Sequence, residues 1–456
     1  MKNLLYIVSM LLAVTLLSCQ SDKHYVITTY GAISDQTTIN TRAIQQAIDD
    51  CHNNGGGTVI VPSGHFITGT VLLKDNVTLH VEEGAQLIGS DNPMDYISID
   101  PFTDATGQVR GKCLVGAEGA NNIAITGQGI IDGRGELFLS KNIKKTMKRL
   151  GVDQSEYGVY ASNRPFLVRL VKSSNIQVKD ISLRQPAAWT LHFFQSKNIL
   201  VDGVKIYSHA HKNNDGIDLD SSSDAIIQNC DIDSGDDAIC FKTTSPVATS
   251  NVVVSNCTLK SDWGTIKFGT ESMGDFKNIV VKNCTINDTR GGGIKILSVD
   301  GANIDNILID NIKMNNVDMP IFIRLGERLR TYRDAPKQKV GSIKNIQISN
   351  VTAVTRSIEE SRVTPPAGIF ITGTPNHSVE NITLSNIAIT LPGGGTAEQV
   401  KAVIAEDEKR YPEFSFFGVL PAYGLYARHA KNIVKENITF SLEGEDAREE
   451  IIIEEN

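Results

Sequence analysis

An evenly spaced repeat in the middle of the chain limits the fold more than any other feature. Asn-Cys pairs recur at one constant interval, at Asn229-Cys230, Asn256-Cys257 and Asn283-Cys284. A second mark in the same register recurs at nearly the same interval, at Asp224, Asn251, Asn278 and Asn306. The interval falls within the period of roughly 20–50 residues that indicates stacked supersecondary units, none of which can bury its own core alone.

Each unit reads as strands and turns rather than helices. Short apolar runs such as 252–254, 279–281 and 307–309 are separated by Asn, Gly and Asp. Looser Asn-Ile pairs extend the pattern from Asn122 to Asn437. We therefore predict an all-β fold: one single-stranded right-handed parallel β-helix over residues 24–456. The repeated asparagines are interpreted as a polar ladder along the turns, with no catalytic role.

A helical cap is expected at the N-terminal end of the solenoid. Residues 38–53 place apolar side chains at helical spacing and are followed by three glycines at 55–57. A cap of this kind covers strand edges that an open solenoid would expose. Strands are then predicted at 58–61, 71–73 and 77–81.

Residues 1–19 predict an export signal. Lys2 precedes an apolar run from Leu4 to Leu17, too short to remain as a membrane span. Leu16-Leu17-Ser18-Cys19 resembles a bacterial lipoprotein box, so lipidation is expected at Cys19; an ordinary cleaved signal is the alternative. Either way we expect a secreted protein of the periplasm or cell surface, in contact with the membrane only through the lipid anchor.

The cysteine pattern and the net charge limit which ligands and partners we expect. Cys230, Cys257 and Cys284 hold equivalent repeat positions, which predicts stacked core thiols rather than disulfides. No Cys-His cluster has metal-ligand spacing, and we expect no metal, no cofactor and a monomer. The net charge is −8 with both signs mixed along the chain, which argues against nucleic acid as a partner.

Three carboxylates are the leading catalytic candidates. Asp215 precedes Asp236 by close to the length of one coil, and Asp237 follows directly. On neighbouring coils the three side chains would cluster, and mutual repulsion would raise at least one pKa and keep a proton available near neutrality. The neighbouring aspartates are expected to be turn and surface residues: Asp218, Asp220, Asp224, Asp231 and Asp233.

The order of motifs resembles glycoside hydrolase family 28, the polygalacturonases and rhamnogalacturonan hydrolases. The matching segments are Tyr30-Gly31-Ala32, Arg164-Pro165, 186–189 before His192, 213–218 (NNDGID) and 234–239 (SGDDAI). The resemblance implies a pectin-lyase-like β-helix that hydrolyses pectin-type poly- or oligosaccharides with inversion. It also implies Asp236 as general acid, Asp215 and Asp237 as the base, and roughly 6.5–9.5 Å between the carboxyls.

Two departures from the family pattern put a simple polygalacturonan substrate in doubt. Asp262-Trp263-Gly264 stands where polygalacturonases have Gly-His-Gly, and Gly293-Ile294-Lys295 where they have Arg-Ile-Lys. The family's basic residues there help hold the sugar carboxylate.

Replacements for those basic residues are predicted from the repeat. Trp263 follows Asp236 by one repeat interval and is expected to stack on a sugar or desolvate the acid, or else to fill a groove wall. Lys267 and Lys295 are expected to bind an anionic substituent together, unless one pairs with an acid such as Asp237 or Glu271. His211 and Arg324 are weaker candidates for groove residues.

Segments that break the period are expected to shape the groove. Residues 135–163 contain a basic helical stretch at 141–150, either a binding excursion or a solvated helix on the flank. A second excursion spans 326–339 and a third includes 406–413. The long excursions near Leu150 and Arg330 favour trimming of chain ends over internal cleavage. The alternatives are a calcium-assisted β-helix lyase and a degenerate, non-catalytic glycan-binding lipoprotein.

Overall fold

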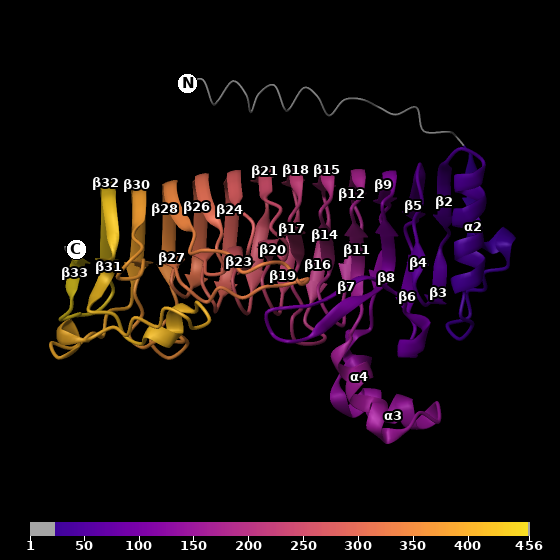
Figure 1. The fold of residues 1–456 in the computed structure, drawn as a ribbon, viewed down its shortest axis with the longest axis horizontal. Coiled ribbons are helices and arrows are strands. Elements are labelled where there is room, and N and C mark those ends of the chain that lie inside the picture. The colour runs from indigo at the N-terminus through magenta and orange to yellow at the C-terminus, as the bar shows by residue number, and fades with distance from the viewer. Residues whose placement is uncertain (1–22, 455–456) are drawn as a thin grey trace.

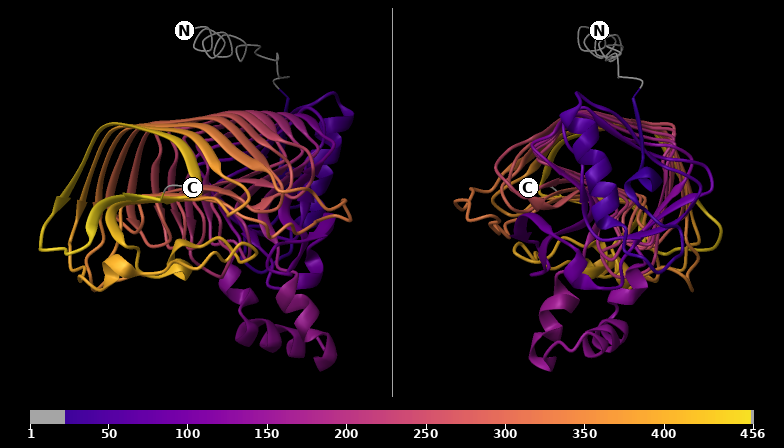
Figure 2. Two further views of the ribbon diagram at one scale, coloured as in Figure 1. Left: turned by 60° about the vertical axis from the view of Figure 1, so that its left-hand side comes forward. Right: turned by 90° about the vertical axis from the view of Figure 1, so that its right-hand side faces the viewer.

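The computed structural model describes residues 23–454, and its chain forms a right-handed parallel β-helix, as predicted. Strands stack side by side along the long axis, with the N-terminal helix at one end and the last strand at the other (Figure 1). Seen along that axis, the coils superimpose into a single tube (Figure 2). Export signal, lipoprotein box and Cys19 all fall outside the described residues.

Two parallel sheets form the walls of the tube. The strands of the larger sheet are β1 (His24–Val26), β2 (Gly57–Val61), β3 (Gly64–Thr68), β5 (Val77–Val81), β6 (Ala85–Gly89), β9 (Asn121–Thr126), β10 (Ile130–Asp132), β12 (Ser174–Lys179), β13 (Ser182–Arg184), β15 (Lys197–Asp202), β16 (Lys205–Ser208), β18 (Ser223–Gln228), β19 (Asp231–Ser234), β21 (Thr249–Ser255), β22 (Thr258–Ser261), β24 (Phe276–Thr289), β26 (Asn303–Val317), β28 (Ser342–Thr355), β30 (Val379–Leu391) and β32 (Ala430–Leu442).

We call the other sheet the groove sheet, because the candidate site lies at it. Its parallel strands are β4 (Val71–Leu72), β8 (Val109–Glu118), β11 (Phe166–Val171), β14 (Leu191–Phe194), β17 (Ile217–Asp220), β20 (Ile239–Thr243), β23 (Ile266–Ser272), β25 (Ile294–Ser298), β27 (Ile321–Leu325), β29 (Ile369–Thr372), β31 (Ala422–Arg428) and β33 (Glu449–Ile453). Antiparallel to β8 lies β7 (Ser98–Thr103).

Strand register reproduces the sequence repeat. Val252 pairs with Ile279 and Ile279 with Ile307, so each coil advances by the interval seen in the sequence. Inward-facing Val, Ile and Leu side chains of successive coils form one contiguous core from Ile27 to Ala427. The six cysteines from Cys51 onward are free and buried, as expected of core thiols.

The repeated asparagines form the predicted ladder. Asn278 donates from Nδ2 to Asn251 Oδ1 at 3.0 Å, and Asn306 donates to Asn278 at 2.8 Å. Asn278 has φ 55°, in the left-handed region that Asn tolerates better than most residues. Asparagine therefore serves both the left-handed bend within β21, β24 and β26 and the stacking between coils.

The N-terminal cap is helix α2 (Thr41–Asn53), whose Ile44, Ala47, Ile48 and Cys51 are buried against the first coils. Observed strands β2, β4 and β5 match the three predicted after it. Short 3-10 turns are η2 (Ile27–Tyr30), η3 (Pro93–Asp95), η4 (Gly135–Phe138), η5 (Gln154–Glu156), η6 (Gln399–Lys401) and η7 (Phe414–Phe417). Over residues 23–454, no helix is long and apolar enough to cross a membrane.

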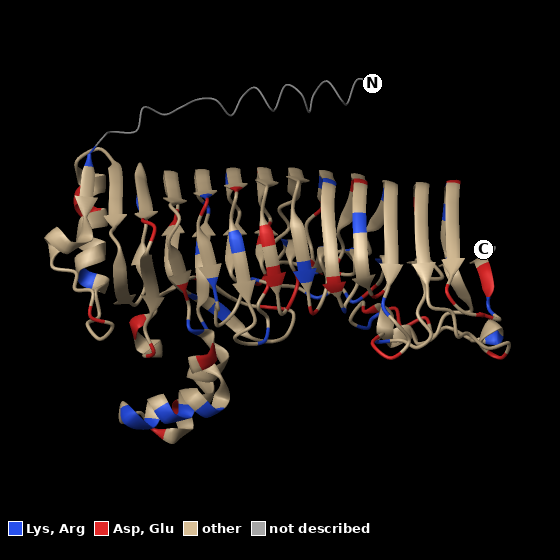
Figure 3. Cartoon of the chain, turned by 180° about the vertical axis from the view of Figure 1, so that it is seen from behind, with Lys and Arg blue, Asp and Glu red and all other residues tan. Residues whose placement is uncertain are grey.

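Three excursions leave the tube where the period breaks. Helices α3 (Ser140–Arg149) and α4 (Tyr157–Ser162) project from its flank, and every charged residue of α3 is basic (Figures 1 and 3). Residues 326–341 follow β27 without regular structure, and residues 392–421 form a long loop between β30 and β31. Among the strands, charged residues are coloured mainly on the middle coils (Figure 3).

Candidate active site

The three predicted carboxylates meet where two neighbouring groove-sheet strands begin. Asp215 precedes β17, and Asp236 and Asp237 precede β20. Because Ile217 pairs with Ile239, the turns before these strands lie side by side. One oxygen of each carboxylate lies within 4.8 Å of the others, so the predicted clustering on adjacent coils is present.

The surroundings give the three clustered carboxyl groups different pKa values. Burial raises the pKa of Asp215 to about 6, although the Lys242 ammonium opposes that rise. Burial, then the charges of Asp215 and Asp237, raise the pKa of Asp236 well above its usual value. Burial acts in the same direction on Asp237, but Lys267, Lys242 and Lys295 outweigh it and lower the pKa. One protonated and one ionised carboxyl group thus stand side by side near neutrality.

Lys242 binds several carboxylates at the centre of the site. Its Nζ lies 3.1 Å from Asp215 Oδ2 and 3.5 Å from both Asp218 Oδ1 and Glu271 Oε2. The same ammonium stands 4.5 Å from the centroid of the Trp189 ring. No role was predicted for Lys242 from the sequence, although its place near the end of the strand that follows Asp237 was a usable signal.

Asp218 and Asp220 correct the expectation of turn and surface residues, since both are fully buried. Asp220 accepts from the Thr244 backbone and hydroxyl at 2.7 and 2.6 Å. Neither oxygen of Asp218 has a hydrogen-bond partner. Burial, reinforced by Asp215, raises the pKa of Asp218 well above its ordinary value, which favours a neutral acid next to Lys242.

The two predicted substrate-binding lysines are paired within the protein. Lys267 and Lys295 are register partners on β23 and β25, as the repeat predicted. Lys267 Nζ lies 2.6 Å from Asp237 Oδ2, and Lys295 Nζ lies 2.7 Å from Glu413 Oε2. The contact of Lys267 with Asp237 is the alternative that was named for this pair, and burial without a carboxylate partner would destabilise either ammonium.

Two distant loops complete the walls of the pocket around the carboxylates. The lining residues are Asp104, Ala105, Thr106, Trp189, Asn213, Asp215, Asp236, Asp237, Lys242, Lys267, Thr270, Glu271 and Tyr411. Asp104, Ala105 and Thr106 belong to the tip of the β7–β8 hairpin, and Ala105 donates its N–H to Glu271 at 3.1 Å. Tyr411 comes from the loop at 392–421, its hydroxyl 3.5 Å from Lys267 Nζ.

The excursion after β27 fixes the hairpin tip from the far side. Arg330 donates to the carbonyl of Ala105, and Arg333 is paired with Asp100. Arg328 binds Asp300 through Nε at 2.9 Å. The hairpin and the excursion therefore meet above the groove sheet, a contact that no repeat in the sequence could have predicted.

His211 takes part in packing rather than in lining the pocket. Its Nδ1 lies 2.8 Å from Arg164 Nη1, and its Nε2 lies 3.3 Å from the Phe138 carbonyl. Burial, then Arg164, lower its pKa to about 4, so the ring is neutral. Arg164 also donates to Asn213 Oδ1 at 2.9 Å, which links His211 to the pocket only indirectly.

Arg324 and Trp263 also lie outside the residues that line the pocket. Buried Arg324 donates to the carbonyls of Gly373 and Glu406, each at 2.7 Å, and thereby holds the loop that contains Tyr411. The register places Trp263 one coil beyond Asp236, as predicted, but its ring is covered by Arg362 at 4.1 Å and lies 5.5 Å from Lys295 Nζ. These contacts favour the groove-wall alternative for Trp263.

The three clustered carboxylates form the one group among residues 23–454 with a geometry that could hold a metal ion. Oxygen ligands of this kind suit a hard cation such as Ca²⁺. Lys267 and Lys242 already neutralise Asp237 and Asp215, however, so the cluster is not simply a set of free ligands.

Comparison with known proteins agrees with this architecture. An exo-poly-alpha-D-galacturonosidase of Dickeya chrysanthemi is 34% identical over 251 residues, which cover 47% of this chain and 41% of that protein. The chain spans less than half the length of the curated relatives it matches.

Solved structures share the fold over nearly the whole chain. An exopolygalacturonase of Thermotoga maritima has a TM-score of 0.68 at 22% identity, covering 91% of this chain and 92% of that one. A family 28 exopolygalacturonase of Yersinia enterocolitica gives 0.65 at 20% identity, covering 93% and 78%. The family model for glycosyl hydrolases family 28 matches residues 51–408, and the chain belongs to that family.

Proposed function

We propose that the protein is a secreted glycoside hydrolase acting on a pectin-type polysaccharide or its oligosaccharides. One observation supports this proposal most strongly. Asp236, whose raised pKa favours the protonated form, lies next to the ionised Asp215 and Asp237 in one pocket. Family membership and the galacturonan-cleaving activity in the names of relatives point to the same substrate class.

In the proposed reaction Asp236 donates its proton to the glycosidic oxygen as the bond to the anomeric carbon breaks. A water molecule attacks that carbon, and Asp215 accepts the water proton. Asp215 Oδ1 is buried without a hydrogen-bond partner, which leaves it free to accept. Asp237, held ionised by Lys267, supports the charge that develops on the sugar and shares the base role.

Inversion of configuration is part of the proposal and rests on the family. The nearest-oxygen spacing of up to 4.8 Å is below the separation of roughly 6.5–9.5 Å between carboxyls that inversion ordinarily uses. The spacing alone therefore does not select the stereochemical outcome. Proton NMR of the first product formed decides it: inversion predicts the anomer opposite to that of the substrate.

We further propose that the enzyme trims chain ends. Residues 104–106 of the hairpin tip and Tyr411 line the pocket together with the carboxylates, so segments from outside the regular coils enclose the site, as expected of an enzyme that binds chain ends. End trimming predicts steady release of monosaccharide or disaccharide with little early loss of polymer viscosity. A rapid fall in viscosity would instead show internal cleavage.

The deciding experiment is product analysis on pectin and rhamnogalacturonan oligosaccharides with wild type and Asp236→Asn. Sugars released by wild type and absent with the variant would support hydrolysis through Asp236. An unsaturated product that a chelator abolishes would identify a lyase. Binding to the same glycans without any product would identify a glycan-binding protein.

Attachment at Cys19 is proposed from the lipoprotein box. Radiolabelled palmitate should be incorporated by the wild-type chain and not by Cys19→Ser when both are expressed in a bacterium. Equal labelling of the two chains would exclude Cys19 as the attachment site.

A further inference from the structure

The lysines around the pocket are engaged by carboxylates of the protein itself. Lys295 is the most enclosed: its side chain and that of Glu413 have no exposed surface, and their ion pair is 2.7 Å long. Lys295 also lies close to the carboxylate cluster, because it and Asp237 border the same glycine. A β-carbon added at Gly264 would be 3.0 Å from Lys295 Cδ and 3.1 Å from Asp237 Oδ1. Glu413 thus neutralises an ammonium that lies beside Asp237, directly behind the residues that line the pocket.

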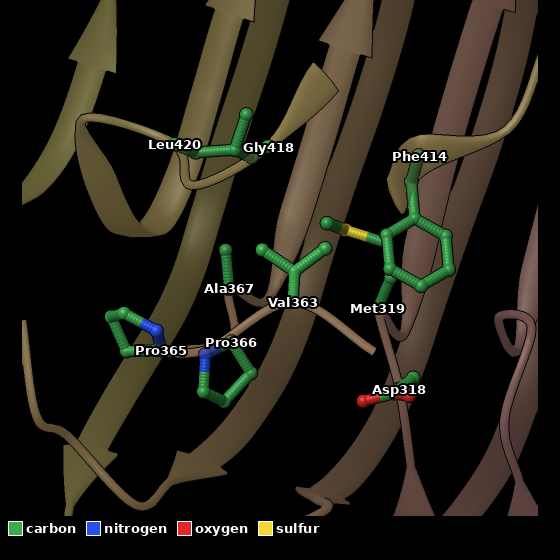
Figure 4. Close-up of a pocket in the computed structure, with 9 residues that line it drawn as sticks. All are labelled: Asp318, Met319, Val363, Pro365, Pro366, Ala367, Phe414, Gly418 and Leu420. Atoms are coloured by element: carbon green, nitrogen blue, oxygen red, sulfur yellow. The ribbon is translucent and has the colours of Figure 1, made fainter. Parts of the chain in front are cut away.

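Glu413 is held in this position by the packing of its loop. Its Oε1 accepts from the Phe414 backbone at 3.2 Å. Phe414 packs into the apolar cluster that includes Met319 and Phe322, and the cavity remaining there is only about 10 Å³ (Figure 4). That volume is no larger than one water molecule requires, so the loop has little freedom to withdraw Glu413.

Three further cations near the carboxylates are engaged in the same way. Lys267 is paired with Asp237, and Lys242 lies among carboxylates that include Asp215 and Glu271. Arg110, buried behind the hairpin tip, donates from Nε to Asp104 Oδ2 at 2.7 Å. Each of these cations already has at least one carboxylate of the protein as its partner.

Arg164 differs, because its partners are neutral. It donates from Nη1 to the Lys212 carbonyl at 2.6 Å and from Nη2 to Asn213 Oδ1 at 2.9 Å. Its side chain does not belong to the residues that line the pocket. Arg164 therefore adds positive charge behind the wall but offers no bond to a group held inside.

The balance of charge in the pocket does not favour an anion. Its lining contains five acidic residues and two lysines. Arg110 and Arg164 stand behind the lining residues and add two positive charges, and a proton on Asp236 removes one negative charge. The net charge around the pocket is then zero and not positive. A carboxylate on the bound sugar would find Lys242 and Lys267 already paired and would lie among carboxylates of its own sign, which disfavours binding.

We propose that the sugar held in this pocket has no charge, and that Glu413 enforces this selectivity by occupying Lys295. The inference rests on the proposed hydrolase function and narrows its substrate. Within pectin-type glycans, the terminal residue removed is then a neutral sugar or a uronate masked as an ester. Glu413 acts through Lys295 and is a specificity residue rather than a catalytic one.

The first test uses oligosaccharides that differ in their non-reducing end: galacturonate, its methyl ester, galactose or rhamnose. Wild type should release an uncharged end on the order of 100-fold faster than galacturonate, as expected for like-charge repulsion in a closed site. The ester separates a masked uronate from a true neutral sugar. Galacturonate released as fast as any uncharged end would overturn the inference and leave the proposed function intact.

The second test frees Lys295. Glu413→Gln keeps the side-chain shape and the acceptor for Phe414 but removes the charge, so release of galacturonate relative to the best uncharged end should rise roughly 10-fold. Glu436→Gln, which removes one exposed charge from β32, is the matched control and should not change the ratio. An unchanged ratio in a folded Glu413→Gln protein would contradict the role of Glu413.

A double variant tests the role of Lys295 without leaving a buried charge unpaired. Lys295→Met combined with Glu413→Leu replaces the buried pair by apolar groups, a change that is often tolerated. It should fold and show no gain on galacturonate, because the freed cation is absent. A gain in this double variant would mean that the loop, and not Lys295, sets the preference. Failure of wild type to release any of the four ends would instead refute the proposed function itself.

Discussion

The turns with the asparagine ladder and the groove sheet use the same coil geometry for different purposes. Asn251, Asn278 and Asn306 put one residue type at one register position, and Asn278 and Asn306 each donate to the amide of the previous coil. On the groove sheet, Cys240, Lys267 and Lys295 also share one register position. The ladder repeats one residue type, whereas this groove position has a cysteine followed by two lysines.

The difference follows from charge. An amide both donates and accepts, so identical neighbours satisfy each other indefinitely. An ammonium only donates, so Lys267 and Lys295 cannot satisfy each other and each takes a carboxylate from elsewhere. The partner of Lys295 comes from residue 413, in a loop outside the repeat. A repeat can build the tube by itself, but the charged site depends on excursions.

The largest effect is expected at the acid. Asp236→Asn should reduce kcat/KM by about 10²–10⁴-fold, because the amide cannot donate a proton to the leaving oxygen. Its effect on the melting temperature should be small, since the raised pKa of Asp236 already favours a neutral group there. Asp231→Asn, exposed on β19, is the control and should keep full activity. Equal activity of the two variants would remove Asp236 from the mechanism.

A smaller but still large effect is expected when the central cation is removed. Lys242→Met leaves Asp215, Asp218 and Glu271 without their shared partner, and loss of one member of a buried ion pair costs about 3–5 kcal/mol of unfolding free energy. Chemical denaturation measures this directly. Lys277→Met, at a pair that is half exposed on the larger sheet, should cost under about 1 kcal/mol. If both variants lost a similar amount of unfolding free energy, ion pairs in the groove would be no more important for stability than those on the outer surface.

The pH dependence of activity should reflect the same burial. Asp215 must be ionised to accept the water proton, and its pKa is raised to about 6, so kcat/KM should fall as pH drops through that value. Activity should also fall at higher pH when Asp236 loses its proton, and both transitions belong to the coupled cluster rather than to single residues. An acidic transition near the ordinary aspartate pKa of about 3.9 would mean that the base is well solvated.

Prediction from sequence succeeded where residues recur. The constant interval between Asn-Cys pairs predicted the parallel coils, the ladder, the stacked thiols and the adjacency of Asp215 with Asp236 and Asp237. It also placed Lys267 beside Lys295 correctly. What each lysine binds was not predictable from the interval, because Glu413 and Tyr411 arrive from a segment with no repeat.

The burial of individual aspartates was also not predictable from the sequence repeat. Asp218 and Asp220 follow Asp215 in a segment that reads as a polar turn, yet both lie on β17 and face other groove-sheet side chains. Their partners, Lys242 and Thr244, are one coil away, where hairpin and loop excursions exclude water. Arg324 was expected near the groove for its position at a strand end, but its bonds hold the loop at Glu406 instead.

The smallest effect is expected in the ladder. Asn278→Ala removes the bonds to Asn251 and Asn306 and places alanine at φ 55°, so we expect a loss of about 1–3 kcal/mol of unfolding free energy. Asn278→Gly loses the same bonds but accepts the left-handed backbone, so the difference between the two variants isolates the conformational cost. Activity per folded molecule should not change in either variant, because the ladder lies on the larger sheet, away from the residues that line the pocket. A large loss of kcat/KM in Asn278→Gly would show that ladder and groove are coupled through the coil, and the separation of scaffold from site would no longer hold.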